Sequence, residues 1–319
     1  MPTHRRKVAM PKIAIIGAGL AGIACARLLT QRGASVTVFE KSRGFGGRCA
    51  TKRWLDCRVD HGAQYFTMRD GEFKQAIEEA CGDQVSTLNA PLFHRESGES
   101  SISPRYYHRL GNSHLCRDLA QGLEVRFEQI IDQVTPDGYC WKVLGEAFDQ
   151  VVSTAPLPQT LRLLGQPPIR DSYIPCLALL LMYRNPPQGL TAKYYGMTSR
   201  PDEDIAWSAC ENHKEGRVTP GHSVMVVHAG EKFSRQHLEE APEAWSALLR
   251  QQLERLWEIP AQDFHAQATH RWKFARVNAP VSPPILPAGL HFCGDALGES
   301  RVESAWLQGR AKADAVMVF

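Results

Sequence analysis

The sequence predicts a two-domain α/β protein whose first domain opens with a βαβ unit that binds a dinucleotide. A short apolar strand pattern at residues 13–16 runs directly into a glycine-rich turn. Gly17, Gly19 and Gly22 have the G-x-G-x-x-G spacing that lets a backbone approach a pyrophosphate at a helix N-terminus. A helix and a second strand pattern then end at Glu40, where a carboxylate can accept hydrogen bonds from a ribose hydroxyl.

The composition indicates a protein that acts on small molecules. The 319 residues suffice for one or two domains. Lys and Arg total 37 against 34 Asp and Glu, and the formal net charge of +3 is too small to imply nucleic acid or a membrane surface as a partner. We therefore expect no nucleic-acid or membrane partner, and a monomer or weak dimer.

Cysteine usage and the first residues indicate a cytoplasmic protein. The 9 cysteines are scattered and form no C-x-x-C pair, so neither a disulfide framework nor a metal site is predicted. Residues 4–7 are basic and precede a largely apolar run, as in an export signal. Cleavage there would remove the first strand and the glycine turn. We therefore interpret residues 1–10 as a disordered basic extension.

A second glycine-rich loop follows Glu40 at residues 41–48 and ends in Arg43-Gly44-Phe45-Gly46-Gly47-Arg48. An NAD-binding domain has no evident need for it. Together with the first turn, this R-G-x-G-G-R segment resembles the FAD-binding flavoproteins that include amine oxidases, protoporphyrinogen oxidases and renalases. The resemblance implies a Rossmann-like FAD-binding domain of the p-hydroxybenzoate hydroxylase/amine oxidase type and a substrate domain of β-sheet plus helix. Arg48, and more loosely Arg43, would then lie near the pyrophosphate or flavin edge.

The segment Asp60-His61-Gly62-Ala63-Gln64-Tyr65-Phe66-Thr67 is similar to one found near the flavin in renalases and their bacterial relatives. The resemblance makes Gln64 and Tyr65 candidates to face flavin or substrate. Tyr65 and Phe66 also fit alternating strand residues, one of which packs in the core. We interpret His61 as a hydrogen-bonded structural histidine rather than a base, because nothing nearby marks a proton to be moved.

The remaining elements are predicted from periodicity and turn residues. Helices are expected at 20–32, 70–81, 112–123, 242–257 and 302–318. Strands are expected at 124–127, 130–134, 139–144, 148–153, 176–183, 205–208, 223–229 and 290–293, with an extended proline-rich loop at 280–287. We assign residues 1–84, 108–156 and 262–319 to the FAD-binding domain, and 85–107 and 157–261 to a substrate cap.

The resemblance extends to the later motifs. The backbone of Val134 would meet the adenine, and Arg271-Trp272-Lys273-Phe274-Ala275 would lie beside the flavin ring after a short strand. Asp295 would bind the ribitol or pyrophosphate, and the last helix would direct its positive N-terminus at the flavin C2 carbonyl. The set expected to bind non-covalent FAD is Gly17, Ala18, Gly19, Leu20, Ala21, Gly22, Glu40, Lys41, Arg43, Gly46, Gly47, Arg48, Gly62, Ala63, Gln64, Tyr65, Val134, Ala155, Gly294, Asp295, Val302, Glu303 and Ala305.

The substrate pocket is expected to include Gln64, Tyr65, Trp207, Arg271 and Trp272. The resemblance to renalase implies an FAD-dependent oxidase that oxidises 2- and 6-dihydro isomers of NAD(P)H. Hydride would pass to flavin N5 and O2 would be reduced to H2O2, so the partners are a nicotinamide nucleotide and O2. Arg271, Lys273 and Arg301 are candidates to meet the substrate's phosphates, although each fits a surface or structural cation better.

Three alternatives stay open. A flavin amine oxidase would share these FAD motifs and would use an aromatic cage, for which Tyr65, Trp207, Trp272 and Trp306 are available. A hydroxylase of aromatic compounds and a non-catalytic FAD-binding protein are the other two.

Overall fold

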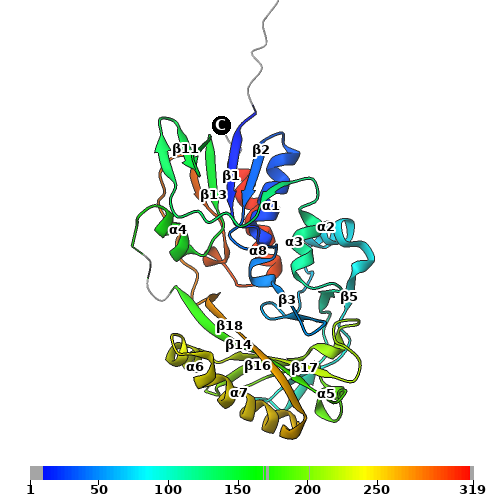
Figure 1. The fold of residues 1–319 in the computed structure, drawn as a ribbon. Helices are drawn as coiled ribbons and strands as arrows, with labels where there is room; N and C mark the ends of the chain where they lie inside the picture. Colours follow the sequence, from blue (N-terminus) through cyan, green and yellow to red (C-terminus); the bar gives the residue numbers. More distant parts are fainter. Residues whose placement is uncertain (1–9, 168, 170–171, 201, 317–319) are drawn as a thin grey trace, which may run out of the picture.

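The structure is a computed structural model that describes residues 10–167, 169, 172–200 and 202–316. The expected basic extension, up to residue 9, and the expected end of the last helix at 317–318 lie outside the described residues. Two large sheets organise the chain, and each is covered by helices of its own (Figure 1). Among the described helices, none is both long and apolar enough to cross a membrane.

The first sheet has five strands in the order β19-β13-β1-β2-β9 and is parallel throughout. Its strands are β1 (Lys12–Ile16), β2 (Ser35–Phe39), β9 (Glu124–Arg126), β13 (Gln150–Ser153) and β19 (Leu290–Phe292). Strands β1 and β13 are almost wholly buried, as expected for a parallel sheet with both faces covered.

One face of this sheet is covered by helices α1 (Leu20–Gln31) and α8 (Val302–Val316). The two helices pack closely, because a Cβ on Gly309 of α8 would lie 2.2 Å from the carbonyl oxygen of Ala21. The other face is covered by a small antiparallel sheet of β10 (Thr135–Asp137), β11 (Cys140–Val143) and β12 (Glu146–Phe148).

The second sheet has seven strands in the order β18-β14-β17-β16-β15-β6-β7. They are β6 (Leu92–His94), β7 (Glu99–Ser101), β14 (Tyr173–Tyr183), β15 (Gly196–Thr198), β16 (Ile205–Cys210), β17 (Ser223–Ala229) and β18 (Phe264–Val277). Helix α7 (Pro242–Trp257) covers one face with a stripe of buried Trp and Leu side chains at helical spacing, Trp245, Leu249, Leu253 and Trp257. Helices α5 (Leu190–Lys193) and α6 (Glu231–His237) lie nearby.

The remaining elements connect the two sheets (Figure 1). They are helices α2 (Gly71–Cys81), α3 (Ser113–Leu119) and α4 (Leu157–Leu163), and two antiparallel pairs, β3 (Thr51–Trp54) with β4 (Cys57–Asp60) and β5 (Val85–Thr87) with β8 (Tyr106–His108). Cys57 and Val59 of β4 pack against the seven-stranded sheet.

Most predicted helices and strands are confirmed, with four differences. The single strand predicted at 148–153 is divided, because Phe148 ends β12 of the small sheet and β13 begins at Gln150 in the first sheet. The strand predicted at 130–134 is wrong: the N–H groups of Gln129 and Val134 bond to the carbonyls of Glu40 and Leu163, so the segment is an extended loop. The helix predicted to reach 123 ends at Leu119, before Gly122 adopts a φ of +81°. The short strand predicted before Arg271 is instead the 14-residue β18, which extends the second sheet to Val277.

Candidate functional site

One large cavity of about 1160 Å³ lies between the two sheets. On one side it is lined by the turn after β1, the end of β2 and the loop at 41–50, and on the other by β14, β16, β17 and β18. The expected FAD ligands that line it are Gly17, Gly19, Leu20, Ala21, Glu40, Lys41, Gly46, Gly47, Arg48, Gly62, Ala63, Ala155, Gly294, Asp295, Val302 and Ala305. Trp207, Arg271 and Trp272 of the expected substrate pocket also line it.

The three glycines of the first turn meet different steric requirements. Gly17 has a φ of +111°, and a Cβ on it would lie 2.6 Å from Thr154 Oγ1. A Cβ on Gly22 would lie 2.0 Å from the carbonyl oxygen of Gly17. Gly19 has no atom within 4 Å of its added Cβ and lines the cavity as the N-cap of α1, with no side chain capping the helix. The helix N-terminus is therefore open to an anion in the cavity.

The second glycine loop lies against the first. The Gly46 N–H donates to the Ala18 carbonyl at 3.2 Å, and a Cβ on Gly47 would lie 3.5 Å from Gly19 Cα. Gly46 has a φ of +119°, which an L side chain rarely adopts. Two backbone segments thus form one continuous floor of the cavity.

Glu40 is fixed at the end of β2. Its Oε2 accepts the Ala18 N–H at 2.8 Å, and its Oε1 accepts the Ser42 N–H at 2.8 Å and the Ser42 hydroxyl at 2.6 Å. The side chain is 8% exposed and lines the cavity. A carboxylate has about four acceptor sites, so Glu40 keeps the capacity to accept from a ribose hydroxyl.

Arg48 and Asp295 bind each other across 247 residues of sequence, a pairing that the sequence did not predict. The contact is bidentate, with Arg48 Nη2 2.8 Å from Asp295 Oδ1, and the Tyr173 hydroxyl donates to the same oxygen at 3.0 Å. Burial alone would raise the pKa of the Asp295 carboxyl, but the hydrogen bonds and charge of Arg48 outweigh it and the pKa lies below its usual value. The pair joins the second glycine loop to the segment that precedes α8.

The opposite wall is built from rings anchored on one carbonyl. The His61 carbonyl accepts Trp272 Nε1–H and His228 Nε2–H, each at 3.0 Å. The His61 ring stacks on Trp272 with centroids 5.3 Å apart and contacts His270 at 4.6 Å. Burial lowers the pKa of both His61 and His228 to about 4. All four side chains therefore line the cavity as neutral rings at pH 7.

Seven expected ligands do not line the cavity: Ala18, Gly22, Arg43, Gln64, Tyr65, Val134 and Glu303. Gln64 turns its amide toward the Asp60 carbonyl, and Tyr65 packs against Tyr195 and Trp207. Glu303 accepts the N–H groups of Arg69 and Asp70 at 2.6 and 2.7 Å. Of Tyr65 and Phe66, which the sequence predicts to be alternating strand residues, Phe66 is the one that packs in the core. Neither Gln64 nor Tyr65 lies on the cavity wall.

Sequence reasoning missed His228 and His270. His228 is the one histidine of β17, and His270 shares β18 with the exposed His265, so no motif marks either of them. Only their position in the sheet brings them together. Strands β17 and β18 flank β14, and His228 and His270 both pair with Ala178 of β14. That register becomes visible only once the strands are paired.

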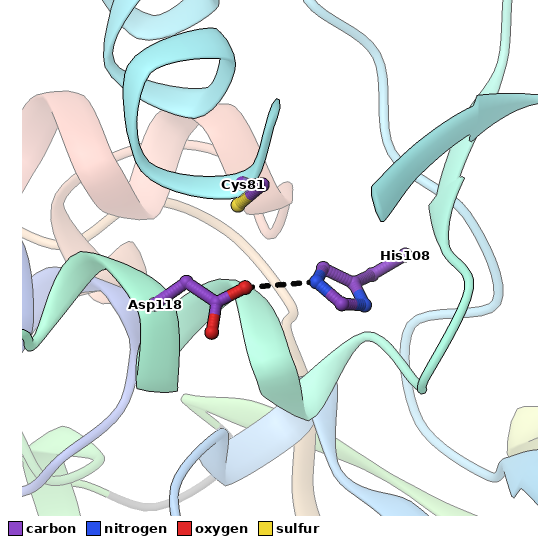
Figure 2. Close-up of side chains that lie close together, drawn as sticks. All are labelled: Cys81, His108 and Asp118. Carbon is purple, nitrogen blue, oxygen red and sulfur yellow. Dashed lines mark hydrogen bonds and ion pairs between the residues drawn. The ribbon is translucent and has the colours of Figure 1, made fainter. Parts of the chain in front are cut away.

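A second cluster, away from the cavity, brings together Cys81, His108 and Asp118, whose ligand-type atoms lie within 4.8 Å of one another (Figure 2). The Leu110 N–H donates to His108 Nδ1 at 3.1 Å, so the ring proton sits on Nε2 and is donated to Asp118 at 2.9 Å. Burial raises the pKa of the Cys81 thiol to about 12. A metal on Nε2 would force the proton onto Nδ1, facing the Leu110 N–H, so this geometry favours hydrogen bonding.

A glycine-built nucleotide cradle that faces a second sheet across one cavity is typical of a dinucleotide-dependent oxidoreductase. Comparison with protein families agrees. Residues 15–80 match the NAD(P)-binding Rossmann-like domain, and residues 81–317 match the flavin containing amine oxidoreductase family. The chain belongs to the flavin containing amine oxidoreductase family.

Curated relatives match only part of the chain. Polyamine oxidase 4 of Oryza sativa subsp. japonica is 28% identical over 141 residues, which cover 42% of this chain and 27% of that protein. Polyamine oxidase 2 of Arabidopsis thaliana is 30% identical over 140 residues, covering 41% of this chain and 26% of that protein. The matched stretch thus spans about a quarter of each relative.

Solved structures share the fold over nearly the whole chain. Reduced UDP-galactopyranose mutase has a TM-score of 0.75 at 11% identity, covering 97% of this chain and 96% of that one. Putrescine oxidase bound to putrescine has a TM-score of 0.71 at 12% identity, covering 97% and 99%. The predicted α/β fold with an FAD-type Rossmann domain is confirmed. FAD is the cofactor, and the cavity fits it through the open α1 N-terminus, the space beside Gly19 and the Glu40 carboxylate.

Proposed function

We propose that this protein is a renalase-like FAD-dependent oxidase that converts dihydro isomers of NAD(P)H, with the hydride on ring carbon 2 or 6, to NAD(P)+. The charge of the cavity carries the proposal. Seven Lys and Arg residues line it against four Asp and Glu residues. Such a lining favours a substrate that carries phosphates and disfavours a polycation such as a polyamine.

The ring wall suits a nicotinamide. Trp272 offers a planar face beside His61 and His270, on which a dihydropyridine can stack. When bound, FAD supplies the hydride acceptor and passes the electrons to O2, giving H2O2. The product ring is a cation, and the neutral His61 and His228 add no opposing charge where it forms. The contribution of these residues is to bind and orient the substrate ring.

The cations on the substrate side differ in what they already bind. Arg271 donates to the Glu240 carbonyl at 2.6 Å, and Lys273 pairs with Glu239 at 2.9 Å. Arg301 pairs with Glu299 at 3.1 Å. The Arg276 side chain also lines the cavity and has no hydrogen bond or ion pair with any described residue. Arg276, which the sequence did not single out, is therefore the cation best placed to receive a substrate phosphate.

The second candidate is a flavin-dependent amine oxidase. The polyamine oxidases of rice and Arabidopsis and the fold of putrescine oxidase support it. Of the four aromatic residues considered for an amine cage, Trp207 and Trp272 line the cavity, whereas Tyr65 and Trp306 do not. The cavity therefore retains only part of that cage.

Anaerobic mixing of the purified flavoprotein with borohydride-reduced NAD+ tests the proposal. The readout is the absorbance of the flavin band at about 450 nm. We expect fast bleaching by this mixture, which contains the 2- and 6-dihydro isomers, and none by pure 4-dihydro NADH. Putrescine and spermidine serve as the competing substrates. Bleaching by amines alone would overturn the proposal in favour of the amine oxidase.

A further inference from the structure

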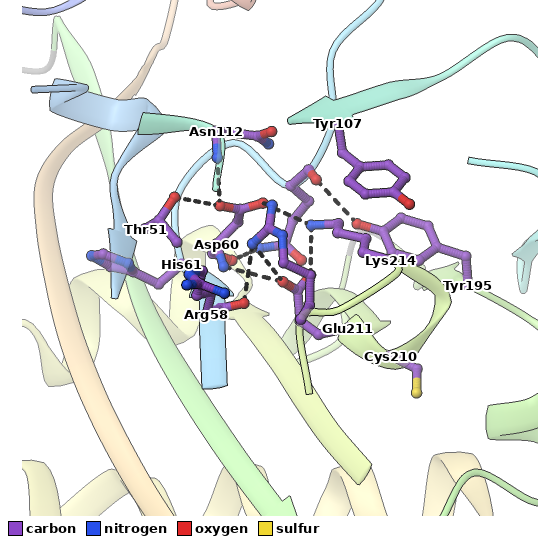
Figure 3. Close-up of polar contacts among 12 residues, drawn as sticks. Thr51, Arg58, Asp60, His61, Tyr107, Asn112, Tyr195, Cys210, Glu211 and Lys214 are labelled. Carbon is purple, nitrogen blue, oxygen red and sulfur yellow. Dashed lines mark hydrogen bonds and ion pairs between the residues drawn. The ribbon is translucent and has the colours of Figure 1, made fainter. Parts of the chain in front are cut away.

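Four charged side chains form a buried cluster beside the ring wall: Asp60, Glu211, Lys214 and Arg217 (Figure 3). The charged part of each is 0% exposed. Asp60 ends β4, whereas the other three come from the turn that follows β16 in the second sheet. With two acids and two bases, the cluster is electrically balanced.

Asp60 is held at three of its atoms, two of them by the other members of the cluster. Asp60 Oδ2 accepts Lys214 Nζ at 2.9 Å and Arg217 Nη2 at 2.7 Å. The Asp60 N–H donates to Glu211 Oε2 at 3.1 Å, and Lys214 ties Glu211 in place at 2.6 Å. Asp60 Oδ1 accepts the Thr51 hydroxyl at 2.6 Å and the N–H of Asn112 at 3.0 Å.

His61, the residue after Asp60, provides the carbonyl that holds two side chains of the cavity wall. The His61 carbonyl receives both Trp272 and His228. Gly62 follows so close to the second glycine loop that a Cβ on it would lie 2.0 Å from the Arg48 carbonyl oxygen. The His61 peptide is thus held on one side by the cofactor loop and on the other by Asp60.

We propose that Glu211 and Lys214 are positioning residues, which hold Asp60 and so fix the His61 carbonyl that orients Trp272 and His228 in the cavity. Neither Glu211, Lys214 nor Arg217 lines the cavity. Buried ion pairs add little net stability compared with apolar packing, but their directional bonds fix one arrangement. A cluster that ties β4 to the second sheet at this point therefore sets the geometry of the substrate wall.

The test uses the FAD-loaded full chain with Glu211→Gln combined with Lys214→Met. The pair of changes removes one anion and one cation, so the remaining Asp60 and Arg217 stay balanced. Leu249→Ala is the control, because Leu249 lies in the buried core between α7 and the second sheet and does not line the cavity. It lowers stability without contacting the cluster.

The first readout is the tautomer of His228, followed by long-range ¹H–¹⁵N NMR of protein labelled with ¹⁵N-histidine. His228→Gln identifies the signal. In the unaltered protein we expect a neutral ring protonated at Nε2, as its bond to the His61 carbonyl requires. The double variant should lose this single tautomer, and Leu249→Ala should keep it. An unchanged His228 signal in the double variant overturns the proposal.

The second readout is the Kd of NAD+, measured from the change in the flavin spectrum, and it rests on the proposed function. We expect the double variant to raise the Kd about tenfold, because loosened supporting residues misplace the binding groups, and Leu249→Ala to leave it unchanged. If the unaltered protein does not bind NAD+, the proposed function fails and the NMR readout still decides the positioning role.

A double variant that does not fold is replaced by Glu211→Asp, which keeps the charge and shortens the side chain by one methylene. We then expect the His228 signal to shift while FAD content stays stoichiometric. An unshifted signal in this variant overturns the proposal in the same way.

Discussion

One wall of the cavity is formed by backbone and the opposite wall by side chains. The cofactor side is made of backbone, where the turns around Gly19 and Gly46 lie in contact. The substrate side is made of rings, with Trp272 and His228 anchored on the His61 carbonyl. Where the backbone must approach a ligand closely, a side chain would stand in the way, so the sequence has glycine at those positions. A wall of side chains leaves no such pattern.

This difference predicts a gradient of sensitivity to mutation. On the cofactor side, one added carbon meets backbone atoms that cannot move. On the substrate side, a changed ring alters what the cavity binds while the sheet beneath it stays intact.

The largest effect is expected for Gly22→Val. The new Cβ would lie 2.0 Å from the Gly17 carbonyl oxygen, so the turn and α1 must separate. We expect a loss of stability of about 3 kcal/mol or more, together with loss of flavin. Thermal unfolding and the ratio of flavin to protein absorbance measure the two effects.

Gly19→Val is the matched control, because its Cβ meets nothing within 4 Å and enters the cavity. This variant should fold, as circular dichroism would show, but purify without FAD. Stoichiometric FAD in it would contradict the assignment of this turn to the pyrophosphate.

Arg48→Ala should have the next largest effect. It leaves the Asp295 carboxylate, 2% exposed, with Tyr173 and Ser300 as its remaining partners. Removing one partner of a buried ion pair costs about 3 kcal/mol, and less here because the Arg48 side chain is 32% exposed. Urea unfolding with FAD present measures the loss. Arg48→Ala combined with Asp295→Asn should recover part of it, and a double variant less stable than the single one would contradict this account.

A smaller effect concerns pH. Burial lowers the pKa of His228 from 6.5 to about 4 in the folded protein. Between pH 6.5 and about 4, this histidine is therefore protonated in the unfolded chain and neutral in the folded one. Stability therefore falls as pH drops from about 6.5 toward about 4. His228→Gln should reduce the slope of unfolding free energy against pH by about 1 kcal/mol per pH unit in that window.

Urea unfolding at several pH values measures this slope. His265→Gln, a change at an exposed histidine outside the cavity, is the control. An unchanged slope for His228→Gln would mean that this ring is not buried as a neutral group.

The smallest effect separates two cations on the same strand. Lys273→Ala breaks an exposed ion pair with Glu239 that contributes little to stability, and it should leave the KM of the dihydropyridine nucleotide within about twofold. Arg276→Ala removes the unpaired cation and should raise that KM about fivefold, near 1 kcal/mol. Steady-state oxygen consumption gives both values, and equal KM changes in the two variants would argue against a phosphate contact at Arg276.

The sequence predicted the parts of the fold that local chemistry decides. The glycine turn, Glu40 and the stripe of α7 each follow from spacing alone. The pairing of Arg48 with Asp295 could not be read, because it depends on the return of the chain 247 residues later. The strand at 130–134 was mispredicted for a related reason: its apolar residues are extended, but β9 and β10 on either side belong to different sheets.

The pairing of β13 with β19 has a consequence for how the protein is made. Five of the seven strands of the second sheet, β14 to β18, lie between these neighbouring parallel strands in the sequence, so β19 and α8 are synthesised after them. Until they emerge, the first sheet lacks an edge strand and α1 lacks the helix that packs on it. Joining ends so distant in sequence is slow unless the intervening segment folds first and shortens the gap. We therefore expect most of the second sheet to fold on the ribosome before the cofactor cradle is complete, and FAD to be captured only after β19 and α8 have joined the first sheet.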